Sequence, residues 1–218
     1  MLSKIKSMSL EGLTGYLVEI QSDVSGGLPS FEIVGLPDVR VKEAKERVRT
    51  AIKNSGIEFP SRKIIVNLAP ADIRKEGTFF DLPIAIGILI ALGEISKIKI
   101  KNLESTIFLG ELSLDGNINR VNGVLPMCIE ALELGIKRVI LPRENAMEAS
   151  IIKGLDVIPV SCLLNVIEYI AGDLKIENYV ADGDINLKNI ENYEIDFSDV
   201  KGQESAKRAL EIAATRCT

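Results

Sequence analysis

Five charged side chains lie close together in the middle of the sequence, between an apolar segment that ends at Leu68 and another that begins at Leu82. They are Asp72, Arg74, Lys75, Glu76 and Asp81. A charged loop between a buried strand and a buried helix is where α/β proteins place catalytic residues or a partner contact. The residues alone support two interpretations. One is a structural loop with solvated charges. The other is an interface edge, because apolar Phe79 and Phe80 adjoin the charges.

The composition excludes several kinds of site. The sequence contains no histidine, which rules out His-based catalytic triads and Cys/His zinc sites. Cys128 and Cys162 lie in apolar sequence typical of small buried side chains, and Cys217 is far from both. The glycines within residues 26–35 fit turns, because no G-x-G-x-x-G pattern follows a strand and G-x-x-x-x-G-K-[ST] does not occur.

A strand before the charged loop and a helix after it must position these side chains. Residues 64–68 are an apolar strand, and Pro70 ends it. Residues 82–92 are apolar nearly all round, which predicts a helix buried on most sides. Asp81 is the predicted N-cap of this helix, and Pro83 lies in its first turn, where a missing N–H costs little.

Strands at residues 3–10, 13–22 and 28–34 are predicted before the loop, with glycine-containing turns between them. Asp38 then caps a predicted helix that runs to about Asn54. One face of this helix is apolar at helical spacing, with Val41, Ala44, Val48, Ala51 and Ile52.

A basic stripe runs beside that apolar face. It consists of Lys42, Lys45, Arg49 and Lys53. Cations along one side of a helix can neutralise several phosphates, which makes this stripe the candidate DNA contact. The alternative is an ordinary solvated face, because Glu43 and Glu46 lie on the same helix.

After the central helix, the sequence predicts strands at 107–111, 139–141 and 156–160, and helices at 123–134, 143–150 and 163–170. Asp115 and Gly116 form the turn of a short hairpin. Three strands followed by repeated strand–helix units predict an α/β or α+β domain with a mixed sheet.

The remaining sequence changes character. Residues 173–199 are rich in acids without a sustained apolar period, which predicts an extended linker. This segment has eight acids and two lysines and so carries −6, whereas the rest of the chain sums to about +1. Residues 200–218 turn helical and resemble the opening of a second domain. The predicted organisation is therefore a domain over 1–172, a linker over 173–199 and an incomplete domain from 200.

No part of the sequence predicts a membrane contact. The longest apolar run, 82–92, is about half the length that crosses a bilayer. The first ten residues lack the apolar region of a secretory signal. We therefore expect a soluble cytoplasmic protein.

Four sequence stretches together are specific: GLPSFEIVGLPD at 27–38, VNLAPAD at 66–72, KEGTFFDLP at 75–83 and GELSLDG at 110–116. They resemble the N-terminal domain of the magnesium-chelatase-like AAA+ ATPases of the ComM/YifB family. The resemblance covers essentially all of residues 1–170, and the segment at 200–212 resembles the one that opens the family's AAA+ module.

This resemblance implies a Lon-protease-like fold, which belongs to the superfamily of the GHMP kinases and a small-subunit ribosomal protein. It also implies hexameric rings, ATP and Mg²⁺ bound by the C-terminal part of the full-length protein, and a DNA task. In ComM-type members that task is helicase-like branch migration during natural transformation. Because residues 1–218 lack the phosphate-binding motif, we expect no cofactor in this fragment and no ATP hydrolysis by it.

Lon-type proteases use a Ser nucleophile and a Lys base, and the resemblance aligns these positions with Phe79 and Leu125. Neither side chain can replace the catalytic residue. Thr78 with Lys75 is the remaining pair, so a residual Ser/Thr peptidase is the alternative. We therefore predict no catalytic and no metal residues.

The resemblance favours a non-catalytic accessory domain for subunit assembly or for DNA or partner contact. Its charged loop would face a neighbouring subunit, the AAA+ ring or DNA. A purely structural cap of the ring is the third hypothesis.

Overall fold

The computed structural model describes residues 2–95, 103–180, 200 and 202–215. The chain forms one compact unit over residues 1–181 and a second over 182–218. In the second unit, α6 (Glu204–Thr215) is an amphipathic helix whose Leu210 and Ile212 are exposed. Most of the predicted acidic linker lies outside the described residues.

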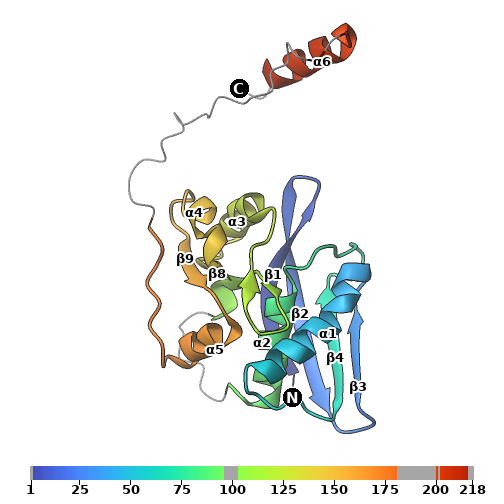
Figure 1. Ribbon diagram of the computed structural model, residues 1–218, viewed down its shortest axis with the longest axis vertical. Helices are drawn as coiled ribbons and strands as arrows, with labels where there is room; N and C mark the ends of the chain where they lie inside the picture. Colours follow the sequence, from blue (N-terminus) through green and yellow to red (C-terminus); the bar gives the residue numbers. More distant parts are fainter. Residues whose placement is uncertain (1, 96–102, 181–199, 201, 216–218) are drawn as a thin grey trace. The chain divides into compact units, whose positions relative to one another are not determined.

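The first unit is built on a seven-stranded mixed sheet with the spatial order β3-β4-β2-β1-β5-β8-β9 (Figure 1). The strands are β1 (Leu2–Glu11), β2 (Thr14–Ser25), β3 (Ser30–Val34), β4 (Lys63–Ala69), β5 (Thr106–Phe108), β8 (Arg138–Pro142) and β9 (Asp156–Val160). β2 runs antiparallel to β1 and β4, and the other neighbours in the sheet are parallel. The predicted mixed sheet is therefore confirmed.

The predicted strand at 107–111 is wrong in extent. β5 ends at Phe108, and β6 (Glu111–Leu112) pairs with β7 (Ile118–Asn119) in a separate hairpin. Gly110 lies between β5 and β6. A Cβ atom at this position would approach Ile118 Cγ2 to 2.7 Å and Leu82 Cβ to 3.3 Å. A side chain at Gly110 would crowd Ile118 and the start of α2, so glycine lets the chain leave the sheet close to this helix.

The helices are α1 (Val39–Asn54), α2 (Asp81–Leu92), α3 (Val124–Glu133), α4 (Ala146–Ala149) and α5 (Leu163–Ala171), with 3-10 turns at Leu103–Ser105 and Arg143–Asn145. Asp38 is confirmed as the cap of α1, because its carboxylate accepts a hydrogen bond from Val41 N at 2.8 Å. All five residues of the predicted apolar face of α1 are buried.

The central sheet is covered on both faces near β1 and β2. α2 lies on the face of Ser3 and Ser22, where Ser3 Oγ donates to Gly87 O at 2.6 Å. α3 lies on the opposite face, where a Cβ atom on Gly15 would come within 2.9 Å of Glu130 Cβ. Ten consecutive residues of α2, from Leu82 to Ala91, are buried, which confirms the predicted helix surrounded by core.

Gly35, directly after β3, fixes the path into α1. Its φ is +96°, and a Cβ atom there would lie 2.2 Å from Leu68 O. We expect Gly35→Ala to lower the free energy of unfolding by about 2 kcal/mol, through backbone strain and this clash. Gly26→Ala is the matched control, because nothing lies within 4 Å of a Cβ atom there. Urea denaturation measures both, and equal stabilities of the two variants would contradict the expectation.

Candidate functional site

The charged loop after β4 is held against the turn that precedes α1. Lys75 N donates to Leu36 O at 3.1 Å, and Asp38 N donates to Lys75 O at 2.9 Å. Tyr16 Oη donates to Arg74 O at 3.0 Å. These hydrogen bonds to backbone groups of the loop fix its path. They do not determine where its charged side chains lie.

The five charges of the loop do not share one surface. Asp72, Arg74 and Glu76 are exposed, and Arg74 Nε lies 3.3 Å from Glu76 Oε1. Lys75 and Asp81 are completely buried. The expectation of a solvated or interfacial position is wrong for these two, because neighbouring backbone and side-chain groups enclose them. Asp72, Arg74 and Glu76 remain candidate interface residues.

Lys75 is the most unusual buried group of the loop. Its Nζ donates to Ile73 O at 2.6 Å. Burial lowers the pKa of the Lys75 amine, because the groups around the ammonium solvate it less well than water does. The negative charge of Asp72 acts in the opposite direction and raises this pKa. The amine is thus directed at a carbonyl within its own loop.

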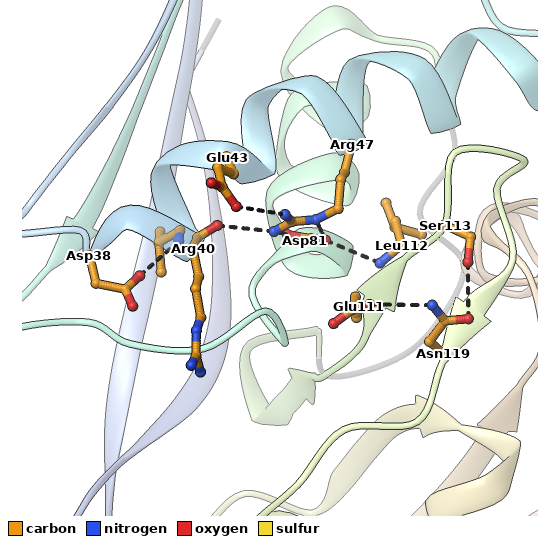
Figure 2. Close-up of polar contacts among 10 residues, drawn as sticks. Asp38, Arg40, Glu43, Arg47, Asp81, Glu111, Leu112, Ser113 and Asn119 are labelled. Carbon is orange, nitrogen blue, oxygen red and sulfur yellow. Dashed lines mark hydrogen bonds and ion pairs between the residues drawn. The ribbon is translucent and has the colours of Figure 1, made fainter.

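Asp81 joins three elements in one polar cluster (Figure 2). Its carboxylate accepts two hydrogen bonds from Arg47 of α1, from Nε at 2.6 Å and from Nη2 at 3.0 Å. A third comes from Leu112 N of β6 at 3.2 Å. Arg47 also donates to Arg40 O and lies 3.9 Å from Glu43. The cluster therefore ties α1, α2 and β6 together.

The predicted role of Asp81 as an N-cap is wrong. Phe80 occupies the cap position of α2 without a side-chain hydrogen bond, and Asp81 is the first helical residue. Its carboxylate instead faces Arg47 and Leu112, where a guanidinium offers stronger hydrogen bonds than the helix backbone.

Burial and the Arg47 guanidinium act in opposite directions on Asp81. Burial raises the pKa of Asp81 to about 6, although the hydrogen bonds from Arg47 and Leu112 favour the charged form. The same pairing raises the pKa of Arg47, so the guanidinium stays charged. A buried carboxyl that titrates near neutral pH is therefore held beside a permanent cation.

Arg47 is the residue that sequence reasoning missed. It lies between Ala44 and Ala51 at the border of the buried face of α1, and its side chain is 21% exposed. This border position is a local signal that Arg47 shares with half-buried Lys45 of the basic stripe. It predicts a partly buried guanidinium, which requires an acidic partner in the core.

The positions aligned with the Lon-type nucleophile and base carry no reactive group. Phe79 is 9% exposed and packs on Phe80 with ring centroids 4.7 Å apart. Leu125 lies half-buried in the first turn of α3. For the remaining pair, the described residues include no hydrogen bond between Thr78 and Lys75, whose amine is directed at Ile73 O.

The basic stripe is brought together on one flank of α1. Lys42, Arg49 and Lys53 are exposed, and Lys45 is half-buried. The Arg49 guanidinium lies over the Phe59 ring, 5.6 Å from its centroid. Three lysines and one stacked arginine therefore lie on the same side of the helix.

The described residues contain no group of three or more His, Cys, Asp or Glu side chains suited to hold a metal ion. None of their helices combines the length and apolar character needed to span a bilayer.

Comparison with known proteins identifies the family. The family model described as subunit ChlI of Mg-chelatase matches residues 20–145, more than half of the chain. The chain belongs to the magnesium-chelatase-like ComM/YifB family. It is 39% identical to competence protein ComM of Haemophilus influenzae over 98% of its own length and 41% of that protein. It is 37% identical to YifB of Escherichia coli over 98% of its length and 40% of that protein.

A more distant similarity concerns the fold. Lon protease 2 of Bacillus subtilis is 32% identical over 132 residues, which are 59% of this chain and 22% of that protein. The mixed sheet with helices on its faces agrees with the expected Lon-like fold of the ComM/YifB domain. The chain spans about two fifths of the length of the ComM and YifB relatives that it matches.

Proposed function

We propose that the chain is the N-terminal accessory domain of a ComM/YifB-type AAA+ ATPase, and that it binds a partner rather than cleaving peptide bonds. In the full-length protein, ATP and Mg²⁺ would bind outside residues 1–218, and the subunits would form a hexameric ring. The domain would contribute subunit assembly or a contact with DNA or a protein partner.

One observation carries the non-catalytic part of this proposal. The positions of the Lon-type nucleophile and base hold Phe79, which packs in the core, and Leu125. Neither side chain can attack a carbonyl or accept a proton. Family membership supports the proposal that this domain is part of a longer ATPase, because the matched relatives extend well beyond it.

The DNA contact is proposed for the basic stripe. We expect the double variant Lys45→Glu/Arg49→Glu to weaken binding to duplex or forked DNA about tenfold at low salt, because it replaces two cations with two anions. Fluorescence anisotropy with labelled oligonucleotides measures this change.

A matched control separates the stripe from overall charge. Arg120→Glu/Lys153→Glu changes the net charge equally at two exposed positions outside α1. Loss of DNA binding by the stripe variant alone supports the proposal. Absent DNA binding, or equal effects of both variants, contradicts the DNA contact and leaves protein partners or a structural cap.

A residual peptidase is the rival from another class. It would use Thr78 as nucleophile and Lys75 as base. The burial of Lys75 and its hydrogen bond to Ile73 O count against it. Casein turnover by the wild-type chain that disappears in Thr78→Ala would favour the rival over the accessory role.

A further inference from the structure

β3 is an open edge of the sheet. Among the described residues it pairs only with β4. Ser30 N donates to Arg62 O at 3.3 Å, so Ser30 directs its backbone groups toward β4. Backbone directions alternate along a strand, and the N–H and C=O groups of Phe31 and Ile33 therefore point away from the sheet. These outward groups can accept an additional strand.

The opposite edge of the same sheet, formed by β9, is hydrogen-bonded to a later segment of the chain. Along β9, Tyr179 N donates to Val157 O at 2.8 Å, and the Asn178 side chain accepts a hydrogen bond from Val157 N at 2.6 Å. Asn178 and Tyr179 thus cover the outward backbone groups of β9 at Val157. Nothing comparable covers β3 in the described parts of the chain, and β3 lies outermost beside β4 in Figure 1.

Exposed apolar side chains continue from the end of the open strand. Val34, Leu36 and Val39 are 43%, 55% and 66% exposed. Leu36 has a φ of +54°, a left-handed conformation that costs a leucine about 1–2 kcal/mol. The backbone is thus strained at a position that presents an exposed leucine beside unpaired strand groups.

The basic stripe lies on the same side of the sheet as Phe31. The Phe31 and Phe59 rings are 5.9 Å apart, and Arg49 lies over Phe59. A strand added to β3 would therefore direct alternate side chains toward the cations of α1. Glu46 and Glu58 border the basic stripe, but its four cations outnumber them, so this surface keeps a net positive charge.

We propose that the β3 edge binds an extended, acidic segment of a partner protein, which pairs with β3 and places alternate carboxylates against the basic stripe. This inference rests on the proposed accessory function and names its partner. Main-chain hydrogen bonds supply affinity in such strand addition, and alternate side chains supply specificity. Acidic side chains complement Lys45 and Arg49, and apolar ones at the strand end fit Leu36 and Val39.

Two other occupants fit this edge less well. A second copy of this chain would bring its own basic stripe and Glu32 toward those of the first, which repel. DNA phosphates would meet the cations, but they gain nothing from outward backbone N–H groups beside exposed leucine and valine. The combination of strand edge, apolar strand end and cations therefore favours an acidic peptide.

The test uses a labelled nine-residue peptide of alternating glutamate and threonine, with anisotropy as the readout. We expect binding that weakens at least about fivefold in Lys45→Glu/Arg49→Glu and changes less than twofold in Arg120→Glu/Lys153→Glu. One control peptide replaces every glutamate by lysine, which removes the charge complementarity. A second is N-methylated at every backbone amide, which removes the backbone donors in either strand orientation. Both should bind at least about tenfold more weakly. Hydrogen exchange should slow at the Phe31 and Ile33 amides when the glutamate peptide binds.

Equal binding of the three peptides, unchanged affinity of the stripe variant, or unprotected Phe31 and Ile33 amides would overturn the inference. Duplex DNA is measured in parallel. If the stripe variant loses DNA binding while the glutamate peptide does not bind, the acidic partner is wrong and the proposed DNA contact stands. If the peptide binds as expected and DNA does not, the inference stands and the DNA contact fails.

Discussion

Replacing Asp81 by alanine is expected to lower the free energy of unfolding by about 4 kcal/mol, more than any other single substitution considered for this domain. The side chain is fully buried and accepts hydrogen bonds from Arg47 and from Leu112 N. Its removal leaves a mostly buried guanidinium without its carboxylate and an amide without its acceptor. Urea denaturation at pH 7 measures the loss.

Two comparison variants identify the cause. Asp72→Ala removes an exposed carboxylate from the same loop and should change stability by less than about 0.5 kcal/mol. Arg47→Met/Asp81→Leu removes both charges and should recover at least half of the loss, because apolar groups then replace the ion pair. If Asp81→Ala behaves like Asp72→Ala, the cluster does not stabilise the fold.

The same carboxyl predicts an unusual dependence of stability on pH. The pKa of Asp81 is raised from 3.8 to about 6, mainly by burial. The folded state therefore holds a proton that the unfolded state has already released. The proton-linked part of the stabilisation from Asp81 is complete below pH 3.8 and is lost as pH rises through 6, a change of about 3 kcal/mol. The hydrogen bonds with Arg47 and Leu112 N remain at pH 7 and account for the loss expected in Asp81→Ala.

Other carboxylates titrate in this range, so the measurement must be a difference. Asp81→Asn keeps the shape of the side chain and cannot ionise. We expect the stability of the wild type relative to Asp81→Asn to fall by about 3 kcal/mol between pH 3.5 and pH 7. A difference that is constant, or that rises with pH, would show that Arg47 outweighs burial and holds the pKa of Asp81 at or below its usual value.

Much of the fold could be predicted because its determinants are local. The apolar face of α1, its Asp38 cap, the uniformly apolar α2 and the Asp115–Gly116 hairpin each follow from residues within a few positions of one another. The family's four motifs include β3, β6, the end of β4 and the start of α2, together with the turns and loops beside them. The structure therefore agrees with the expected mixed sheet.

The burial of Lys75 and Asp81 within the charged loop could not be predicted, because it depends on elements distant in sequence. Lys75 and Asp81 look like solvated charges in sequence, but the turn at Leu36 and the hairpin strand at Leu112 enclose them. Arg47 belongs to α1, far from Asp81 in sequence, and no local pattern pairs them. The open edge at β3 likewise follows only from the spatial order of the strands.

The most direct test that this domain has no peptidase nucleophile is covalent labelling of the native chain by a fluorophosphonate. Mass spectrometry locates any modified residue. Activated hydroxyl nucleophiles react with such probes, whereas ordinary side-chain hydroxyls do not. Because Lys75 is buried and bonded to Ile73 O, we predict no labelling of Thr78 above the level of the urea-unfolded chain. Labelling of Thr78 in the folded chain that is lost in Lys75→Met would contradict the prediction and establish a working nucleophile and base.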